Sequence, residues 1–284
     1  MTRNQRREAQ SRLFGGLVYG MAILALIPLS LVLGFTILKG LPAISHSEFF
    51  LNVERPIGIP GGGISHAITG TLIMVGMASL LAIPVGIMGG LYLVEYGHGR
   101  WANYVRLASD VLTGAPSIAL GLFAYAIIVK PSHHFSAYSA ALALSVLMLP
   151  VVIRTTESAV GLIPGGLREA GLALGLARWK VALLLILPAA APGVITGALL
   201  AVARAAGETA PLLFTSLGNK FYSVDPNGPM SSLTLIVFNG AQSPYPEING
   251  QAWGAALVLV LIVLLINLAS RFALRRQIAL AGKL

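Results

Sequence analysis

The sequence predicts an all-α integral membrane protein with six transmembrane helices. Of its 284 residues, 56% are hydrophobic and only 10% are charged. The mean hydropathy is +0.82, which is far outside the range of soluble domains. The apolar residues form long runs, and about 20 of them suffice to cross the ~30 Å hydrocarbon layer as a helix. Backbone groups in lipid must be satisfied internally, so only helices or closed barrels can span it, and the unbroken runs exclude a barrel.

The six spans follow from the apolar runs in chain order. They are residues 17–38, 67–94, 107–129, 137–153, a segment within 181–206, and 253–269. The first run is too long, and too poorly followed by a small-residue cleavage site, for a cleaved signal peptide, so we expect it to remain as an anchor. Glycines four residues apart let two helices approach closely, although such pairs are also common in membrane helices outside interfaces. The sequence contains three pairs: Gly16 with Gly20, Gly86 with Gly90, and Gly193 with Gly197.

The basic residues predict the orientation of the chain. Of the 19 Lys and Arg residues, 14 flank the spans on the side that carries both termini and four lie on the other side, with Arg204 inside a span. The positive-inside rule therefore places both termini in the cytoplasm. The net charge of +9 is accounted for by these flanks and by anionic lipid, so no nucleic acid partner is expected. The chain has no cysteine, and neither a metal site nor a cofactor is predicted.

Two connections between spans are unusually long. The fourth, residues 155–180, is expected in the cytoplasm and carries short helical patterning. The fifth, residues 211–250, is expected outside and is interrupted by five prolines. Residues 231–238 within it are consistent with a short helix capped by Ser231 or Ser232. Long connections in compact proteins are usually functional, so we expect the fifth to fold over the outer mouth of the bundle.

A charge pair lies at the end of the fifth apolar run. Arg204 and Glu208 are four residues apart, a spacing that allows them to pair on one helix face. Charges within a membrane are costly, so such a pair is by default a candidate functional site. Arginine is also the side chain best shaped to hold an oxyanion by two parallel hydrogen bonds. Position alone does not separate this role from that of a structural ion pair that locks two helices.

The fourth connection contains the sharpest motif. It reads Glu169-Ala170-Gly171-Leu172-Ala173-Leu174-Gly175, then nine residues, then Leu185-Ile186-Leu187-Pro188. A short helix of small residues can be approached closely by another protein, and Gly175 is placed to end it. Arg168, Glu169 and Arg178 would supply its polar edges. The segment resembles the E-A-A-x3-G-x9-I-x-L-P signature of ABC importer permeases, with Gly171 in place of the second Ala and Leu185 in place of Ile.

Three further segments narrow the resemblance. They are Gly114-Ala115-Pro116-Ser117-Ile118-Ala119-Leu120-Gly121-Leu122-Phe123, Leu149-Pro150-Val151-Val152-Ile153-Arg154-Thr155-Thr156-Glu157, and Arg204-Ala205-Ala206-Gly207-Glu208-Thr209-Ala210-Pro211-Leu212. Together they are similar to the permeases of phosphate-specific ABC importers, in particular the A-type subunit. The resemblance extends from about Gly62 to Arg271.

That resemblance implies the type I importer permease fold in a bacterial inner membrane. It implies a permease core at residues 66–271, with a coupling loop at 165–180, an N-terminal part at 1–65 and a cytoplasmic tail at 272–284. The implied substrate pathway residues are Arg204, Glu208 and Thr209. The implied ATPase contacts are Arg168, Glu169, Ala170, Gly171 and Gly175.

The resemblance also implies partners. These are a sister permease in a heterodimer, two cytoplasmic ATPase subunits, a periplasmic phosphate-binding protein, membrane lipid and inorganic phosphate. The chain itself contains no G-x4-G-K-[ST] phosphate loop, so we expect it not to be an enzyme and to rely on a separate ATPase.

Three alternatives stay open. One is a permease for another oxyanion, such as sulfate or molybdate. A second is an intramembrane enzyme that acts on lipid phosphate, with Arg204 binding and a histidine reacting; the absence of histidine from the predicted spans opposes it. A third is a membrane scaffold for sensing, which the coupling motif opposes.

Overall fold

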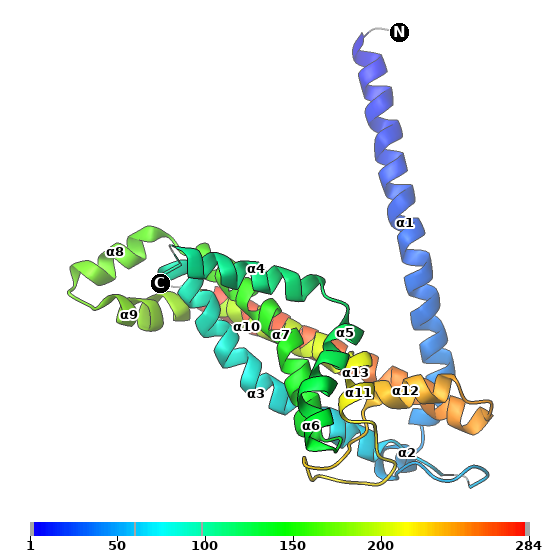
Figure 1. The fold of residues 1–284 in the computed structure, drawn as a ribbon. Helices are drawn as coiled ribbons and strands as arrows, with labels where there is room; N and C mark the ends of the chain where they lie inside the picture. Colours follow the sequence, from blue (N-terminus) through cyan, green and yellow to red (C-terminus); the bar gives the residue numbers. More distant parts are fainter. Residues whose placement is uncertain (1–2, 60, 98, 282–284) are drawn as a thin grey trace.

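A computed structural model describes residues 3–59, 61–97 and 99–281, and within these ranges it contains helices and loops but no strand (Figure 1). Five helices are long and apolar enough to cross a membrane, and one bent helix pair raises the number to six. The all-α membrane class is thereby confirmed. Lys283, one of the charges that predict the orientation, lies outside the described ranges.

The long helices extend most of the predicted spans at both ends. They are α1 (Arg3–Ile44), α3 (Ser65–Glu95), α7 (Ala137–Gly161), the continuous run of α9 (Arg178–Val181), η2 (Ala182–Ile186) and α10 (Leu187–Ala206), and α13 (Pro246–Ala281). The η segment is a turn of π-helix. Because α7 continues to Gly161, residues 154–161 belong to this helix and not to the connection that follows it.

The third predicted span is not one straight helix. It consists of α4 (Arg100–Gly114) and a second run formed by α5 (Ser117–Ala124), η1 (Tyr125–Val129) and α6 (Lys130–Ser132), and the two runs meet at 107°. Ala115 and Pro116 between them have extended ψ angles of 136° and 130°. A proline disfavours helical backbone in the residue before it and cannot donate a backbone hydrogen bond, so the helix stops there. The prediction of a continuous helix over 107–129 is therefore wrong.

Helix α7 lies between α3 and α10, and glycines allow both to approach it closely. A Cβ atom added at Gly90 of α3 would lie 2.6 Å from Cβ of Thr156, and one added at Gly193 of α10 would lie 2.6 Å from Cβ of Ala159. Any side chain there would push the helices apart. Two of the three glycine pairs thus serve contacts within the chain, whereas Gly16 and Gly20 have no neighbour within 4 Å of an added Cβ.

Helix α1 stands away from the other helices for most of its length (Figure 1). Only 6% of its most apolar window is buried. It contacts the bundle near its C-terminal end, where a Cβ at Gly40 would lie 2.6 Å from the carbonyl oxygen of Trp253 on α13. Most of its apolar surface is therefore uncovered in the isolated chain.

Short elements cover the two ends of the bundle (Figure 1). One end, which we call the α8 end, carries α8 (Gly165–Ala173) and α9. The other, the α12 end, carries α2 (Ser47–Leu51), α11 (Ala210–Thr215) and α12 (Leu233–Ala241). The predicted helix at 231–238 is confirmed as α12, and its cap is Ser232, whose side chain accepts a 3.2 Å hydrogen bond from the backbone N–H of Leu235.

Candidate functional site

Arg204 lies in the last turn of α10, shortly before α11 of the α12 end, which begins at Ala210. It is 26 residues beyond Arg178, where this helical run begins, which corresponds to roughly 39 Å along the axis. Its Nε atom is 3.6 Å from Oε1 of Glu208. The helix ends at Ala206, so Glu208 lies in the turn after it and not on the same helix face. The predicted pair therefore exists, but as a contact between a helix end and the following turn.

The guanidinium of Arg204 is held more loosely than those of three other arginines of the described bundle. Its side chain is 43% exposed, and its distance to Glu208 exceeds that of a direct hydrogen bond. Arg106, Arg154 and Arg168, by contrast, each donate at least two hydrogen bonds within the chain. Among the described contacts, Arg204 is thus an arginine whose paired N–H groups are available to an oxyanion.

The turn that carries Glu208 is fixed by α12. The hydroxyl of Thr234 donates a 3.0 Å hydrogen bond to the backbone carbonyl of Glu208. The start of α12 is fixed in turn to α3, because the backbone N–H of Leu233 donates to the hydroxyl of Thr71 at 2.9 Å. Thr209, the third predicted pathway residue, is the N-cap residue of α11, and its backbone carbonyl accepts hydrogen bonds from that helix. The position of Glu208 therefore depends on α3 and α12.

At the opposite end, α8 ends in a Schellman motif. The N–H of Leu176 donates to the carbonyl of Gly171 at 3.2 Å, and the N–H of Gly175 donates to the carbonyl of Leu172 at 2.9 Å. This pair of bonds defines the motif, and the motif requires a left-handed backbone at the residue just after the helix cap, which is Gly175 here. Gly175 has φ of +79°, which glycine adopts at little cost. The sequence-based expectation that Gly175 ends this helix is confirmed.

The two departures from the permease signature face each other. Gly171 is buried, and a Cβ atom there would lie 2.7 Å from Cδ1 of Leu185 and 2.9 Å from Cγ2 of Val181. The absence of a side chain at Gly171 therefore makes room for Leu185, which lies on η2. Glu169 and Ala170 are exposed on the other side of α8.

If α8 is the ATPase contact that the resemblance implies, replacing Gly175 by leucine should lower transport without removing the protein from the membrane. No atom lies within 4 Å of an added Cβ, so the cost is the left-handed backbone, about 1–2 kcal/mol for a residue with a side chain. Gly175→Asn is the matched control, because asparagine tolerates this conformation. We expect transport to fall in Gly175→Leu and to be largely kept in Gly175→Asn, as measured by uptake at equal protein level. Equal uptake in both variants would contradict a role for the motif.

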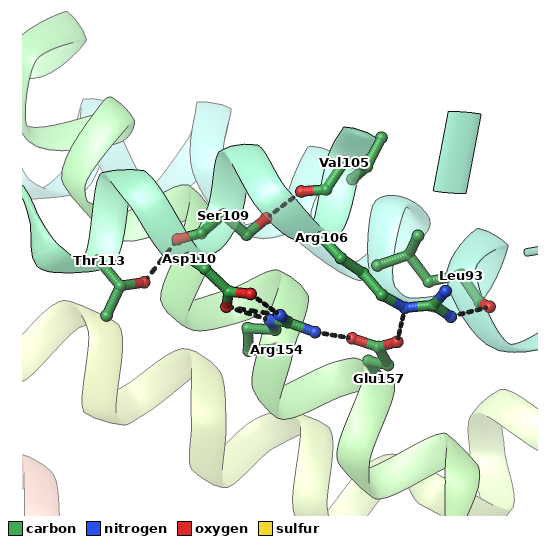
Figure 2. A network of polar contacts seen from close by, with 8 residues as sticks. All are labelled: Leu93, Val105, Arg106, Ser109, Asp110, Thr113, Arg154 and Glu157. Carbon is green, nitrogen blue, oxygen red and sulfur yellow. Dashed lines mark hydrogen bonds and ion pairs between the residues drawn. The ribbon is translucent and has the colours of Figure 1, made fainter. Parts of the chain in front are cut away.

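A network of four charged side chains connects α4 to α7 (Figure 2). Oε1 of Glu157 accepts a 2.7 Å hydrogen bond from Nε of Arg106, and Oε2 accepts a 2.8 Å bond from Nη1 of Arg154. Arg154 also forms a two-pronged contact with the carboxylate of Asp110. Sequence reasoning did not bring these residues together, since the partners are 44 and 51 positions apart.

One expectation about histidine is wrong. Helix α3 starts at Ser65, two residues before the predicted span, so His66 lies within its first turn. The residue is 3% exposed, and neither ring nitrogen has a hydrogen-bond partner among the described atoms. The argument against an intramembrane enzyme from the absence of histidine in the spans therefore does not hold for His66.

The fold and the α8 motif define the class of the protein. Among solved structures, the chain is similar to a permease chain of the methionine ABC transporter MetNI in inward-facing conformations, with a TM-score of 0.59, 20% identity, and coverage of 75% of this chain and 94% of that one. The similarity concerns the fold alone. A family model described as binding-protein-dependent transport system inner membrane component matches residues 82–278. The protein is a permease subunit of this kind of transport system.

Curated relatives are more specific. The chain is similar to "Phosphate transport system permease protein PstA" of Haemophilus influenzae, with 41% identity over 93% of this chain and 94% of the relative. The Yersinia pestis protein of the same name is 43% identical over 84% and 81% of the two chains. "Phosphate transport system permease protein PstA 1" of Mycobacterium tuberculosis is 40% identical over 90% and 86%. The chain belongs to the PstA family of permease proteins, as the sequence motifs predict.

Proposed function

We propose that this chain is the membrane permease subunit of an ATP-driven importer of inorganic phosphate, and that Arg204 binds the anion on its way through. The observation that carries the proposal is the state of the Arg204 side chain, which is 43% exposed and 3.6 Å from its carboxylate partner. An arginine in that state can offer two parallel N–H groups to two oxygens of an anion. Arg204 lies near the end of the α9–α10 run, and we infer that this end of the helix would line one mouth of the pathway.

The names of the relatives support phosphate as the anion. A guanidinium fits sulfate or molybdate as well as phosphate, so geometry does not choose among them. The relatives from Haemophilus influenzae and Yersinia pestis are both named for phosphate transport, and each covers more than four fifths of this chain. Phosphate is therefore the substrate that we propose.

Glu208 would act as the alternative partner of Arg204. Its carboxylate lies 3.6 Å from the guanidinium, close enough to compensate part of the charge. An arriving phosphate competes for the same N–H groups with a better geometry, since two oxygens can be bound at once. Thr209 follows directly and would line the same turn. Binding of phosphate would thereby release the turn between α10 and α11.

The surfaces left uncovered in the isolated chain fit three kinds of partner. The apolar length of α1 and the free Gly16–Gly20 surface would pack against a sister permease, which completes the pathway. The exposed face of α8, with Glu169 and Ala170, would dock into an ATPase subunit, one of two in the complex, which hydrolyses ATP in place of this chain. The α12 end would receive a periplasmic phosphate-binding protein, and the family description names dependence on a binding protein.

The proposal is tested by uptake of radioactive phosphate in cells held at low phosphate, with and without this chain. We expect uptake to depend on the chain, to be insensitive to excess sulfate or molybdate, and to be accompanied by co-purification of an ATPase subunit. Uptake of sulfate or molybdate in place of phosphate would show that the substrate is that oxyanion and not phosphate. A different result would indicate a sensing scaffold: phosphate uptake is normal in cells that lack the chain, and the ATPase still co-purifies with the chain from cells that contain it.

A further inference from the structure

Three arginines from separate elements meet the last residues of α3. Arg106 of α4 donates from Nη2 to the backbone carbonyl of Leu93 at 3.0 Å. Arg178 of α9 donates from Nη2 to the backbone carbonyl of Glu95 at 2.6 Å. Arg168 of α8 donates from Nε to Oε1 of Glu95 at 2.7 Å. The last carbonyls of a helix have no partner within it and carry partial negative charge, so cations are favoured there.

Among these three described acceptors, two are backbone carbonyls and one is a charged group, the carboxylate of Glu95. The Glu95 side chain is only 5% exposed. Removing the partner of such a carboxylate is strongly unfavourable, so the pair with Arg168 is kept together. Arg168 also donates to the carbonyls of Ile163 at 2.9 Å and Val160 at 3.2 Å, at the end of α7. One side chain of α8 thus fastens α8 to the ends of both α3 and α7.

The sequence predicts Arg168 as a polar edge of the surface that contacts the ATPase, and this role stays a prediction. Within the chain, the guanidinium of Arg168 donates to the carboxylate of Glu95 on α3. The backbone of α8 itself packs closely on α9 and η2. The attachment of α8 to α3 in particular therefore runs largely through the ion pair.

Helix α3 continues from Glu95 to the turn at the opposite end of the bundle. It is a single helix of 31 residues, about 46 Å long. Near its start, Thr71 accepts the hydrogen bond from Leu233 of α12, and α12 holds the Glu208 carbonyl through Thr234. A displacement of α8 that pulls on Glu95 would therefore reach the turn beside Arg204 through contacts that are all present in the structure.

We propose that Glu95 is a positioning residue for coupling: its ion pair with Arg168 makes α8 and α3 move as one body, so that motion of the ATPase reaches the Arg204–Glu208 turn. This inference rests on the proposed function. Coupling between two sites requires an element whose position responds to both of them. Helix α3 meets this requirement because it contacts both the α8 end and the α12 end of the bundle directly.

The test uses the complete complex, reconstituted in vesicles with its sister permease, ATPase and binding protein. In Glu95→Gln, we expect ATP hydrolysis to continue while phosphate uptake per ATP falls about tenfold, within the usual range for coupling between two sites. The matched control is Glu54→Gln, which removes the carboxylate of a 2.8 Å ion pair with Lys220 and should leave the ratio unchanged. An unchanged ratio in Glu95→Gln would overturn the proposal.

A second measurement leaves Glu95 in place, so it does not depend on how Glu95→Gln folds. The natural chain has no cysteine, so spin labels on Met88→Cys in α3 and Leu174→Cys after α8, both exposed positions, report one distance. We expect that distance to stay the same in the nucleotide-free and ATP-bound complex. A change of more than about one helical turn, ~5 Å, would overturn the proposal.

Failure of the proposed function is distinguishable from failure of this inference. If the wild-type complex hydrolyses ATP but carries no phosphate, the proposed substrate is wrong. The distance between the two labels tests the attachment of α8 to α3 in either case.

Discussion

Replacing Arg204 by glutamine should abolish phosphate uptake while leaving the complex assembled. Glutamine keeps much of the length of the side chain but loses the charge and the paired N–H groups. Two hydrogen bonds to a charged group contribute roughly 1.5–3 kcal/mol each, so their loss corresponds to a decrease of about 100-fold or more in binding. Assembly should be kept, because the Arg204 side chain makes no direct hydrogen bond among the described contacts. The measurement is uptake at low phosphate, normalised to the amount of purified complex.

Arg204→Lys is the informative control for this prediction. Lysine preserves the positive charge near Glu208 but offers a single ammonium group in place of the planar fork. We expect it to assemble normally and to transport far less than wild type. Full uptake in Arg204→Lys would mean that a positive charge is sufficient and that two-pronged binding of the anion plays no part.

Replacing Glu157 by leucine should strongly destabilise the chain. This carboxylate is 18% exposed and is shared by Arg106 and Arg154, as Figure 2 shows. Without it, the guanidinium groups of Arg106 and Arg154, which are 32% and 34% exposed, face each other with no carboxylate between them, and Arg154 alone keeps a second carboxylate partner, Asp110. Breaking a buried ion pair costs about 3–5 kcal/mol, a large share of the stability of a typical domain. We expect a much lower yield of folded protein and a lower melting temperature in detergent.

Asp110 provides the matched control within the same network. It also accepts hydrogen bonds from Arg154, but its side chain is 60% exposed. Exposed ion pairs contribute little to stability, because water and salt compensate the charges. Asp110→Asn should therefore leave yield and melting temperature close to those of wild type. Equal losses in Glu157→Leu and Asp110→Asn would contradict the importance of burial.

Features with a local cause were predictable from the sequence. The apolar runs determine where α1, α3, α7 and α13 lie, because lipid leaves a helix as the only option for each run. Gly175 was recognisable as a helix end from the small residues before it, and Ser231 or Ser232 as a cap from the short apolar run after them. These signals act over four or five residues, which a single sequence contains in full.

Features that depend on distant partners were not predictable. Arg168 meets Glu95 across 73 positions, and Arg154 meets Asp110 across 44, and no local pattern marks either pair. The 107° bend could have been found, because Pro116 interrupts the apolar run. The end of the helix before Glu208 could also have been predicted locally, because Gly207 precedes it and glycine disfavours continuation of a helix.

The central claim is that the Arg204 charge serves the anion and not the packing of helices. The most direct test is phosphate uptake by the double variant Arg204→Gln with Glu208→Gln, compared with both single variants at equal complex yield. Both charges vanish in the double variant, so a purely structural pair would no longer be needed. Our account predicts that the double variant assembles normally and takes up no phosphate. A double variant that assembles and transports like wild type would contradict it and would identify the pair as a lock between helix and turn.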